Sequence, residues 1–255
     1  LVKVKYFRNN IDAAYLYKKD PKAYKVKEIK ESEFKKIANQ YPAHVLRLGK
    51  NFECGHPRSR EALYQVLGYC KKYAMRPVVT SKLLEFDKRV ADLVIQAEGI
   101  VHISLGRDED EPGAIGQGAT NEWRLQQAVK YRKYKCPTQV RIVADITLPM
   151  TKFHKKSVKV MGGSSGVLLT PLHYTSKSHF ESMRTDTWEQ VKATGLFTYA
   201  KGDLRPNQFH TDWDQTKERC GIVNGREYCN NCVGRISFNK KTYKADLVKL
   251  GWNAE

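Results

Sequence analysis

The stretch between Val45 and Pro171 contains five short apolar runs: VLRL (45–48), PVVT (77–80), IVHISL (100–105), VRIVADI (140–146) and VLLTP (167–171). Each run is rich in β-branched residues, which is typical of strands that are buried on both faces. Their first residues are 32, 23, 40 and 27 positions apart, close to the ~30 residues that a strand, a crossover helix and the next parallel strand require. The stretch therefore predicts parallel strands in a repeating βα unit.

The segments between the runs have the pattern of amphipathic helices. We predict helices at about 58–74, 85–97 and 120–133 from the spacing of their apolar residues. Ser81 precedes the second helix, and we favour it as the N-cap of that helix. The alternative is that Ser81 and Lys82 bind a carboxylate or a phosphate there.

This alternation predicts an α/β fold: a partial or complete (βα) barrel, similar to a TIM barrel, with parallel strands and a small C-terminal subdomain that contains cysteines. We expect three parts in the chain. Residues 1–44 form N-terminal strands and a helix that serve as scaffold, 45–200 form the barrel-like core, and 201–255 form a cysteine-rich, metal-binding extension.

The formal net charge is +18, and it is unevenly distributed. Residues 1–60 carry 15 Lys and Arg against 6 acidic residues, 61–150 carry 13 against 11, and 151–255 carry 17 against 10. Such a basic balance favours a polyanionic partner such as nucleic acid, because neutralised phosphates release counterions. A solvated basic surface is the alternative, and no aromatic RNA-binding signature is present.

No run of eighteen apolar residues and no secretory leader are found, so the sequence predicts no membrane insertion or export. We expect a soluble, cytoplasmic protein, and the sequence does not indicate its oligomeric state.

Polar and reactive residues follow the predicted strands, and in parallel α/β folds the site lies at the carboxyl ends of the strands. The catalytic candidates are Glu53, Cys54, Asp145 and His173. For Cys54 the alternative is an ordinary buried thiol. Arg141 and Asp145 stand at alternating positions of one strand, so their side chains point to the same side. A structural ion pair between them is the alternative to a catalytic role of Asp145.

The C-terminal extension carries three of the six cysteines, Cys220, Cys229 and Cys232. Cys229 and Cys232 form a C-x-x-C pair, whose two thiolates converge on a metal ion from one tight turn. Cys220 supplies a third thiolate, and His210 is the leading candidate for a fourth ligand. The spacing does not separate zinc from an iron–sulfur cluster. Free thiols and redox chemistry are the alternatives to a metal site.

A partial (βα) barrel with a C-terminal cysteine cluster resembles the radical S-adenosylmethionine superfamily, in particular its compact phage and bacterial members. The resemblance covers about Val45 to Cys232 and implies an iron–sulfur cluster and S-adenosylmethionine as cofactors. As cofactor or substrate contacts it implies Ser104 and Arg107 after the third strand, and Asp145 with Thr147 after the fourth. The chain lacks the family's C-x-x-x-C-x-x-C motif. Three alternatives follow: the motif lies ahead of Leu1, the cysteines seen here serve another way, or the chain belongs to another family.

The resulting prediction is a metal-dependent enzyme that acts on a polyanionic substrate such as a nucleic acid or a nucleotide. One alternative is a nucleic-acid-binding protein with a structural zinc knuckle. A further alternative is a metal-dependent hydrolase that uses His102, Asp145, His154 and His173.

Overall fold

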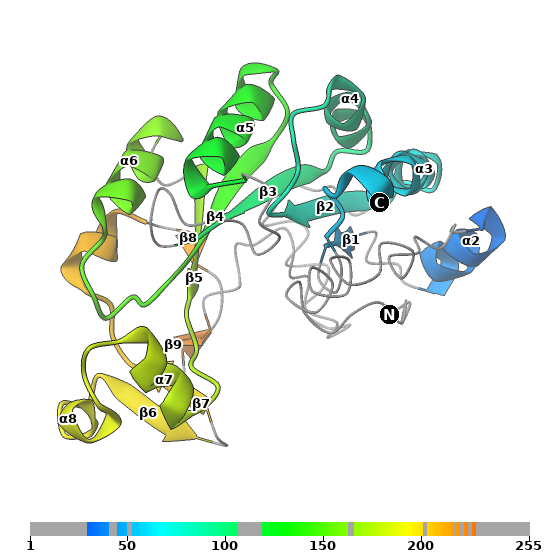
Figure 1. Cartoon of the computed structure of the whole chain (residues 1–255). Coiled ribbons are helices and arrows are strands. Elements are labelled where there is room, and N and C mark those ends of the chain that lie inside the picture. The colour runs from blue at the N-terminus through cyan, green and yellow to red at the C-terminus, as the bar shows by residue number, and fades with distance from the viewer. Residues whose placement is uncertain are drawn as a thin grey trace. The chain divides into compact units, whose positions relative to one another are not determined.

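The computed structural model describes most of the chain between Lys30 and Glu227. The described residues are 30–40, 45–49, 53–106, 119–162, 166–200, 203–216, 218–219, 222–223 and 226–227. They belong to two compact units: the first contains the described residues up to Leu105 and 119–140, and the second contains Gly106 and 141–227. Figure 1 shows how strands and helices alternate along the chain.

The first unit is built from βα repeats. Its elements are α2 (Glu31–Gln40), β1 (Val45–Leu48), the short 3-10 helix η1 (Pro57–Ser59), α3 (Arg60–Lys72), β2 (Arg76–Ser81), α4 (Lys88–Gln96), β3 (Ile100–Leu105) and α5 (Asn121–Lys133). Strand β2 pairs in parallel with β1, where Val45 lies opposite Arg76, and with β3, where Val78 lies opposite Ile100. The predicted α/β class with parallel strands is confirmed.

Helix α3 buries one apolar face. Its members recur at helical spacing and are all buried: Leu63, Val66, Leu67 and Cys70. Among the described residues, α3, α4 and α5 fall within the three ranges that the sequence predicts. Cys70 is completely buried in this face, as expected for a core thiol.

The cap of α4 differs from the prediction. The carboxylate of Asp87 accepts a hydrogen bond from the Val90 N–H at 3.1 Å and caps the helix. Ser81 lies too early in the chain for this role, since the helix begins at Lys88. Helix α5 is capped by the Thr120 hydroxyl, which accepts a hydrogen bond from the Trp123 N–H at 3.2 Å.

Strand β4 (Thr138–Ala144) is where the chain passes from the first unit to the second. The elements that follow are α6 (Lys152–Val160), β5 (Val167–Pro171), α7 (Lys177–Met183), α8 (Trp188–Lys192), β6 (Phe197–Ala200), β7 (Asp203–Pro206), the 3-10 helix η3 (Thr211–Gln215), β8 (Glu218–Arg219), β9 (Ile222–Val223) and β10 (Arg226–Glu227). Strand β5 pairs in parallel with β8, whereas β6 with β7 and β9 with β10 form antiparallel pairs.

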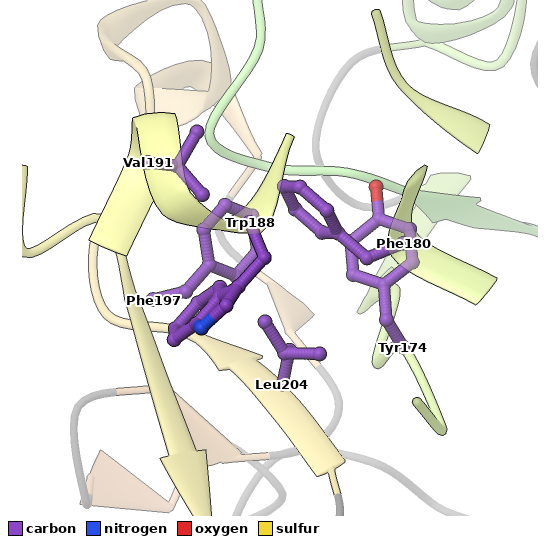
Figure 2. Close-up of a cluster of buried hydrophobic side chains, with 6 residues drawn as sticks. All are labelled: Tyr174, Phe180, Trp188, Val191, Phe197 and Leu204. Atoms are coloured by element: carbon purple, nitrogen blue, oxygen red, sulfur yellow. The ribbon is translucent and has the colours of Figure 1, made fainter. Parts of the chain in front are cut away.

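An aromatic cluster lies between α7, α8 and the β6–β7 hairpin of the second unit. Its buried members are Tyr174, Phe180, Trp188, Val191, Phe197 and Leu204, which Figure 2 shows packed together. The Phe180 ring meets those of Tyr174 and Phe197 edge to face, at centroid distances of 4.9 and 5.3 Å. Such contacts add stability beyond the buried area, and they fix the position of the segment that follows β5.

None of the helices among the described residues has the length and apolar character needed to cross a bilayer. The division into three parts, with its two boundaries, stays a prediction. Residues 1–29 and the three C-terminal cysteines lie outside the described residues.

Candidate functional site

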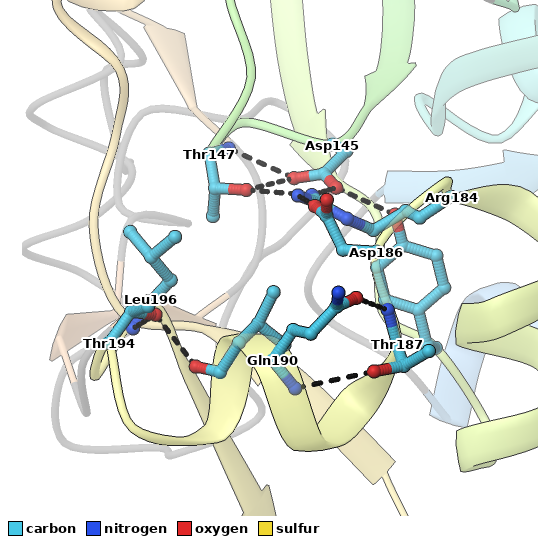
Figure 3. A network of polar contacts seen from close by, with 10 residues as sticks. Asp145, Thr147, Arg184, Asp186, Thr187, Gln190, Thr194 and Leu196 are labelled. Atoms are coloured by element: carbon cyan, nitrogen blue, oxygen red, sulfur yellow. Dashed lines mark hydrogen bonds and ion pairs between the residues drawn. The ribbon is translucent and has the colours of Figure 1, made fainter.

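Asp145 is the centre of a polar network at the carboxyl end of β4 (Figure 3). One carboxylate oxygen, Oδ1, accepts hydrogen bonds from the backbone N–H and the hydroxyl of Thr147, at 3.0 and 2.7 Å. The other, Oδ2, accepts from the Tyr174 hydroxyl at 2.7 Å and from the Arg184 guanidinium. A carboxylate has about four lone-pair positions, so Asp145 is fully hydrogen-bonded. We call Asp145, Thr147, Tyr174 and Arg184 the strand-end cluster.

Arg184 completes this cluster from the turn after α7. Its Nη1 also donates to the Thr147 hydroxyl at 3.1 Å, and its Nη2 donates to Asp186. The side chains of Arg184 and Asp145 are 5% and 9% exposed, whereas that of Asp186 is 43% exposed. Burial alone would lower the pKa of the guanidinium, but the two carboxylates raise it. The ion pair between Arg184 and Asp145 is therefore buried, whereas the pair between Arg184 and Asp186 reaches the solvent-exposed surface.

The aromatic cluster supports the Arg184 side chain from the other side. The guanidinium carbon lies 5.2 Å from the ring centroid of Phe180 and 5.5 Å from that of Phe197. Cations are attracted to aromatic faces at this distance. Packing and ion pairing thus hold Arg184 in one orientation.

Tyr174 donates the hydroxyl bond that joins the segment after β5 to Asp145. Burial raises the pKa of this hydroxyl, and the neighbouring Asp145 carboxylate raises it further. The phenol therefore stays protonated across the neutral range and remains a hydrogen-bond donor.

His173 precedes Tyr174, yet none of the described contacts joins it to the strand-end cluster. Burial lowers the pKa of its imidazole, Arg205 lowers it further, and Asp203 opposes the change. The ring is consequently neutral at neutral pH. Its Nε2 is buried, and no hydrogen-bond partner for it is found within the described part of the chain.

The loop between β4 and α6 is held by η3 and the residue before it. The His210 N–H donates to the Ile146 carbonyl at 2.7 Å, and the Trp213 indole N–H donates to the Leu148 carbonyl at 2.9 Å. Asp212 accepts from the Met150 N–H at 3.1 Å. These bonds fix the loop that carries Thr147.

His210 is the predicted fourth metal ligand, and its Nδ1 accepts a hydrogen bond from the Asp212 N–H at 3.1 Å. Its predicted partners Cys220, Cys229 and Cys232 lie outside the described residues, so the metal site stays a prediction. Within the described ranges, no three His, Cys, Asp or Glu side chains come together as a metal site.

Glu53 organises the strand ends of the first unit. It is 3% exposed, and its Oε1 accepts from the Gly55 N–H at 3.0 Å and from the Ser81 hydroxyl. Its Oε2 accepts from the Lys82 N–H at 2.9 Å. Burial raises the pKa of the carboxyl group, although these hydrogen bonds oppose the rise. Glu53 thus joins the loop after β1 to the loop after β2.

This arrangement corrects the prediction for Ser81. The favoured role was an N-cap, but the Ser81 hydroxyl binds a carboxylate of the chain itself, which is closer to the alternative that the sequence left open. It also accepts from the Leu83 N–H at 2.9 Å. Because Glu53 is 28 residues away in sequence, no local pattern reveals it.

Cys54 follows Glu53 and is 1% exposed. Its thiol donates to the Thr80 carbonyl at 3.3 Å. Burial raises the pKa of the thiol well above its ordinary value, and the Glu53 carboxylate raises it further. The thiol therefore stays protonated at neutral pH, whereas nucleophilic attack by a cysteine requires the thiolate form.

The remaining predicted contacts separate by unit. Glu53, Cys54 and Ser104 belong to the first unit, Asp145, Thr147 and His173 belong to the second, and Arg107 lies outside the described residues. Ser104 is buried. The structure brings Asp145 and Thr147 into contact, and it brings Glu53 and Cys54 together as neighbours in one loop.

Two pairings differ from the expectations. The ion-pair partner of Asp145 is Arg184 rather than Arg141, whose Nε donates to the Thr170 hydroxyl at 2.9 Å. His154, a ligand in the hydrolase alternative, has its Nε2 3.1 Å from the Gly106 carbonyl and its ring 5.3 Å from that of Trp213. It is thus engaged in packing in the second unit.

No protein-family model matches the sequence, and a comparison with curated proteins finds no match. Among solved structures, the chain is similar to a spore photoproduct lyase variant with bound AdoMet and dinucleoside spore photoproduct. There the identity is 11%, the TM-score is 0.45, and the match covers 70% of this chain and 58% of that one. A second spore photoproduct lyase variant has 12% identity and a TM-score of 0.44, covering 68% and 56%.

The HMG-CoA lyase of Bacillus subtilis is also similar, with 11% identity, a TM-score of 0.35, and coverage of 66% of this chain and 59% of that one. The chain therefore spans less than two thirds of each of these three proteins.

Proposed function

We propose that this chain is an enzyme that acts on a polyanionic substrate, of nucleic-acid or nucleotide type, by radical S-adenosylmethionine chemistry. The observation that carries the proposal is the strand-end cluster, in which polar groups are fixed at the carboxyl end of a strand in a parallel α/β fold. Such positions hold the active sites of this fold class. A preorganised polar network of this kind serves substrate positioning.

We assign roles to Asp145 of the cluster, to Asp186, which pairs with Arg184, and to His173, which precedes Tyr174 in the chain. Asp145 is a positioning residue, because its oxygens already accept four hydrogen bonds. Asp186 is exposed enough to accept a hydrogen bond from a sugar hydroxyl or an amine of the substrate. His173 is neutral at neutral pH, so it is able to take up a proton.

The cysteines of the described part do not fit an iron–sulfur cluster. Cys54, Cys70 and Cys136 are buried separately, and burial raises the pKa of each thiol, whereas cluster ligands are thiolates. The proposal therefore assigns the cluster to Cys220, Cys229 and Cys232. Three thiolates would leave one coordination position open for the cofactor that the cluster supplies with an electron.

A nucleic-acid-binding protein with a structural zinc knuckle is the second candidate, and the net charge of +18 favours it. The metal itself separates the two candidates, because a closed zinc site has four protein ligands and no redox chemistry.

Metal and sulfide analysis of anaerobically purified protein tests the proposal. We expect iron and acid-labile sulfide in equal amounts, a broad visible absorption, and loss of both in Cys229→Ser/Cys232→Ser. Cys136→Ala is the matched control and should keep the iron, since Cys136 is a buried core thiol. Zinc without sulfide in the wild-type protein would contradict the proposal in favour of the zinc knuckle.

A further inference from the structure

His173 and Arg205 each have a buried side-chain nitrogen that lacks a hydrogen-bond partner among the described residues, and we infer that the two side chains together bind a phosphodiester group. The atoms are Nε2 of the imidazole and Nε of the guanidinium. His173 is the second residue after β5, and Arg205 lies on β7. We call these two residues the His–Arg pair.

The backbone places the two side chains opposite each other. Tyr174 and Leu204 form an antiparallel bridge, in which each N–H donates to the carbonyl of the other residue, at 3.1 and 2.8 Å. In an antiparallel pairing the residue before Tyr174 stands across from the residue after Leu204, and these are His173 and Arg205. Leu204 packs in the aromatic cluster, whereas Arg205 takes the alternate position of β7 and points to the other face.

Buried donors are nearly always paired in folded proteins, so two neighbouring unpaired nitrogens need an explanation. Arg184 provides a contrast, because its Nε is also buried without a partner in the described part of the chain. Its Nη atoms, however, bind two carboxylates, and its side chain is 5% exposed. For Arg205 the described ion pair is with Asp203 alone, at 3.4 Å, and the side chain is 38% exposed. The Arg205 guanidinium is therefore accessible to a further anion.

The two nitrogens suit a phosphate with two free oxygens. The Arg205 Nε–H donates to one oxygen, and the His173 Nε2–H donates to the other in the tautomer that carries the proton there. Charge favours a diester, because it carries one negative charge whereas a terminal phosphate carries about 1.5 to 2, and Asp203 repels the additional charge. Since His173 follows β5, the group is bound at the strand ends where the active sites of this fold class lie.

Access to the two buried nitrogens depends on the Arg205 side chain. Its Nη2 lies 3.4 Å from the Asp203 carboxylate, beyond the range of about 2.7 to 3.2 Å that is usual for an N–H···O hydrogen bond. A long contact and a partly exposed stem allow the guanidinium to turn and admit the anion. Asp203 is therefore the competitor of the phosphate for Arg205.

The inference rests on the proposed function only in taking a nucleic acid as the substrate, and its test needs neither cofactor nor turnover. NMR of the histidine ring nitrogens follows the full chain while dimethyl phosphate, a simple diester, is added, and then in a second titration with inorganic phosphate. His173→Phe identifies the His173 signals by their loss. The test variants are Arg205→Met and Asp203→Asn. The matched controls are Lys192→Gln and Glu189→Gln, which remove the same charges from an exposed ion pair on α8.

We expect dimethyl phosphate to shift the His173 signals to saturation and inorganic phosphate to bind more weakly. Arg205→Met should lower the affinity for dimethyl phosphate about tenfold or more, because a charge-assisted hydrogen bond is lost. Asp203→Asn should raise it about two- to fivefold, because the competing carboxylate is removed. Both α8 controls should keep the wild-type affinity.

Three results would overturn the inference: His173 signals that dimethyl phosphate does not shift, equal losses in Arg205→Met and Lys192→Gln, and a lower affinity in Asp203→Asn. Tighter binding of inorganic phosphate than of the diester would also overturn it, in favour of a terminal phosphate. Circular dichroism verifies that the variants are folded, because substitutions of exposed residues usually change stability little. If dimethyl phosphate binds as expected but AdoMet is not cleaved, the proposed function alone fails.

Discussion

Replacing Gly49 with alanine is expected to lower the free energy of unfolding of the first unit by more than about 4 kcal/mol, which is exceptional for one substitution. Gly49 follows β1 and has a φ of +82°, a conformation that side chains disfavour. A Cβ atom at this position would lie 1.7 Å from the Thr80 carbonyl oxygen. That oxygen is on the backbone of β2, so the clash separates two paired strands.

Urea unfolding followed by circular dichroism measures this effect. The matched control is Gly68→Ala in the middle of α3, where the added methyl group meets no atom within 4 Å. This change should stabilise the protein by about 0.5 to 1 kcal/mol, because alanine is the better helix former. If Gly49→Ala unfolds at the same urea concentration as the wild type, the close approach of the two strand ends is wrong.

The second large effect is expected at Arg184. Arg184→Met leaves the buried Asp145 carboxylate without its ion-pair partner, and breaking such a pair typically costs about 3 to 5 kcal/mol. Methionine keeps part of the packing against Phe180 and Phe197. The loss of stability therefore comes mainly from the unpaired charge of Asp145. Tryptophan fluorescence is a suitable probe, since Trp188 lies in the adjacent aromatic cluster.

Two further variants make this prediction specific. Arg205→Met removes a partner of Asp203 from a pair whose side chains are 38% and 35% exposed, and it should cost less than about 1 kcal/mol. The double variant R184M/D145N should lose less than the sum of its single variants, because it leaves no unpaired charge. Additive losses in that cycle would show that Arg184 and Asp145 do not interact.

The strands and helices could be predicted because their signal is local. A continuous apolar run such as PVVT, and the helical spacing of the apolar residues in α3, are both visible within a short stretch of sequence. The N-cap of α4 was missed because Ser81 and Asp87 are both good cap residues. What separates them is the contact of Ser81 with Glu53, which depends on the packing of two βα loops.

The candidate site could be predicted only in part, for the same reason. Asp145 and Thr147 were found because they follow a strand end. Arg184 was missed, since it lies 39 residues from Asp145 in a turn that has no periodic pattern. The ion pair considered between Arg141 and Asp145 is not formed. Alternation along a strand tells which residues share a side, but it does not tell which of them are in contact.

The most direct test of the proposed chemistry is the cleavage of AdoMet by the anaerobically purified full chain with dithionite as the electron donor. Reductive cleavage breaks one carbon–sulfur bond and yields methionine and 5′-deoxyadenosine, which chromatography quantifies. Dithionite supplies the electrons, and the hydrogen of the new carbon–hydrogen bond comes from the substrate as an atom or, without substrate, from the solvent as a proton with a second electron. We predict that the wild-type protein forms both products in equal amounts, that DNA increases their rate of formation, and that Cys229→Ser/Cys232→Ser abolishes it. Protein that contains an iron–sulfur cluster but leaves AdoMet intact, with and without DNA, would contradict the account.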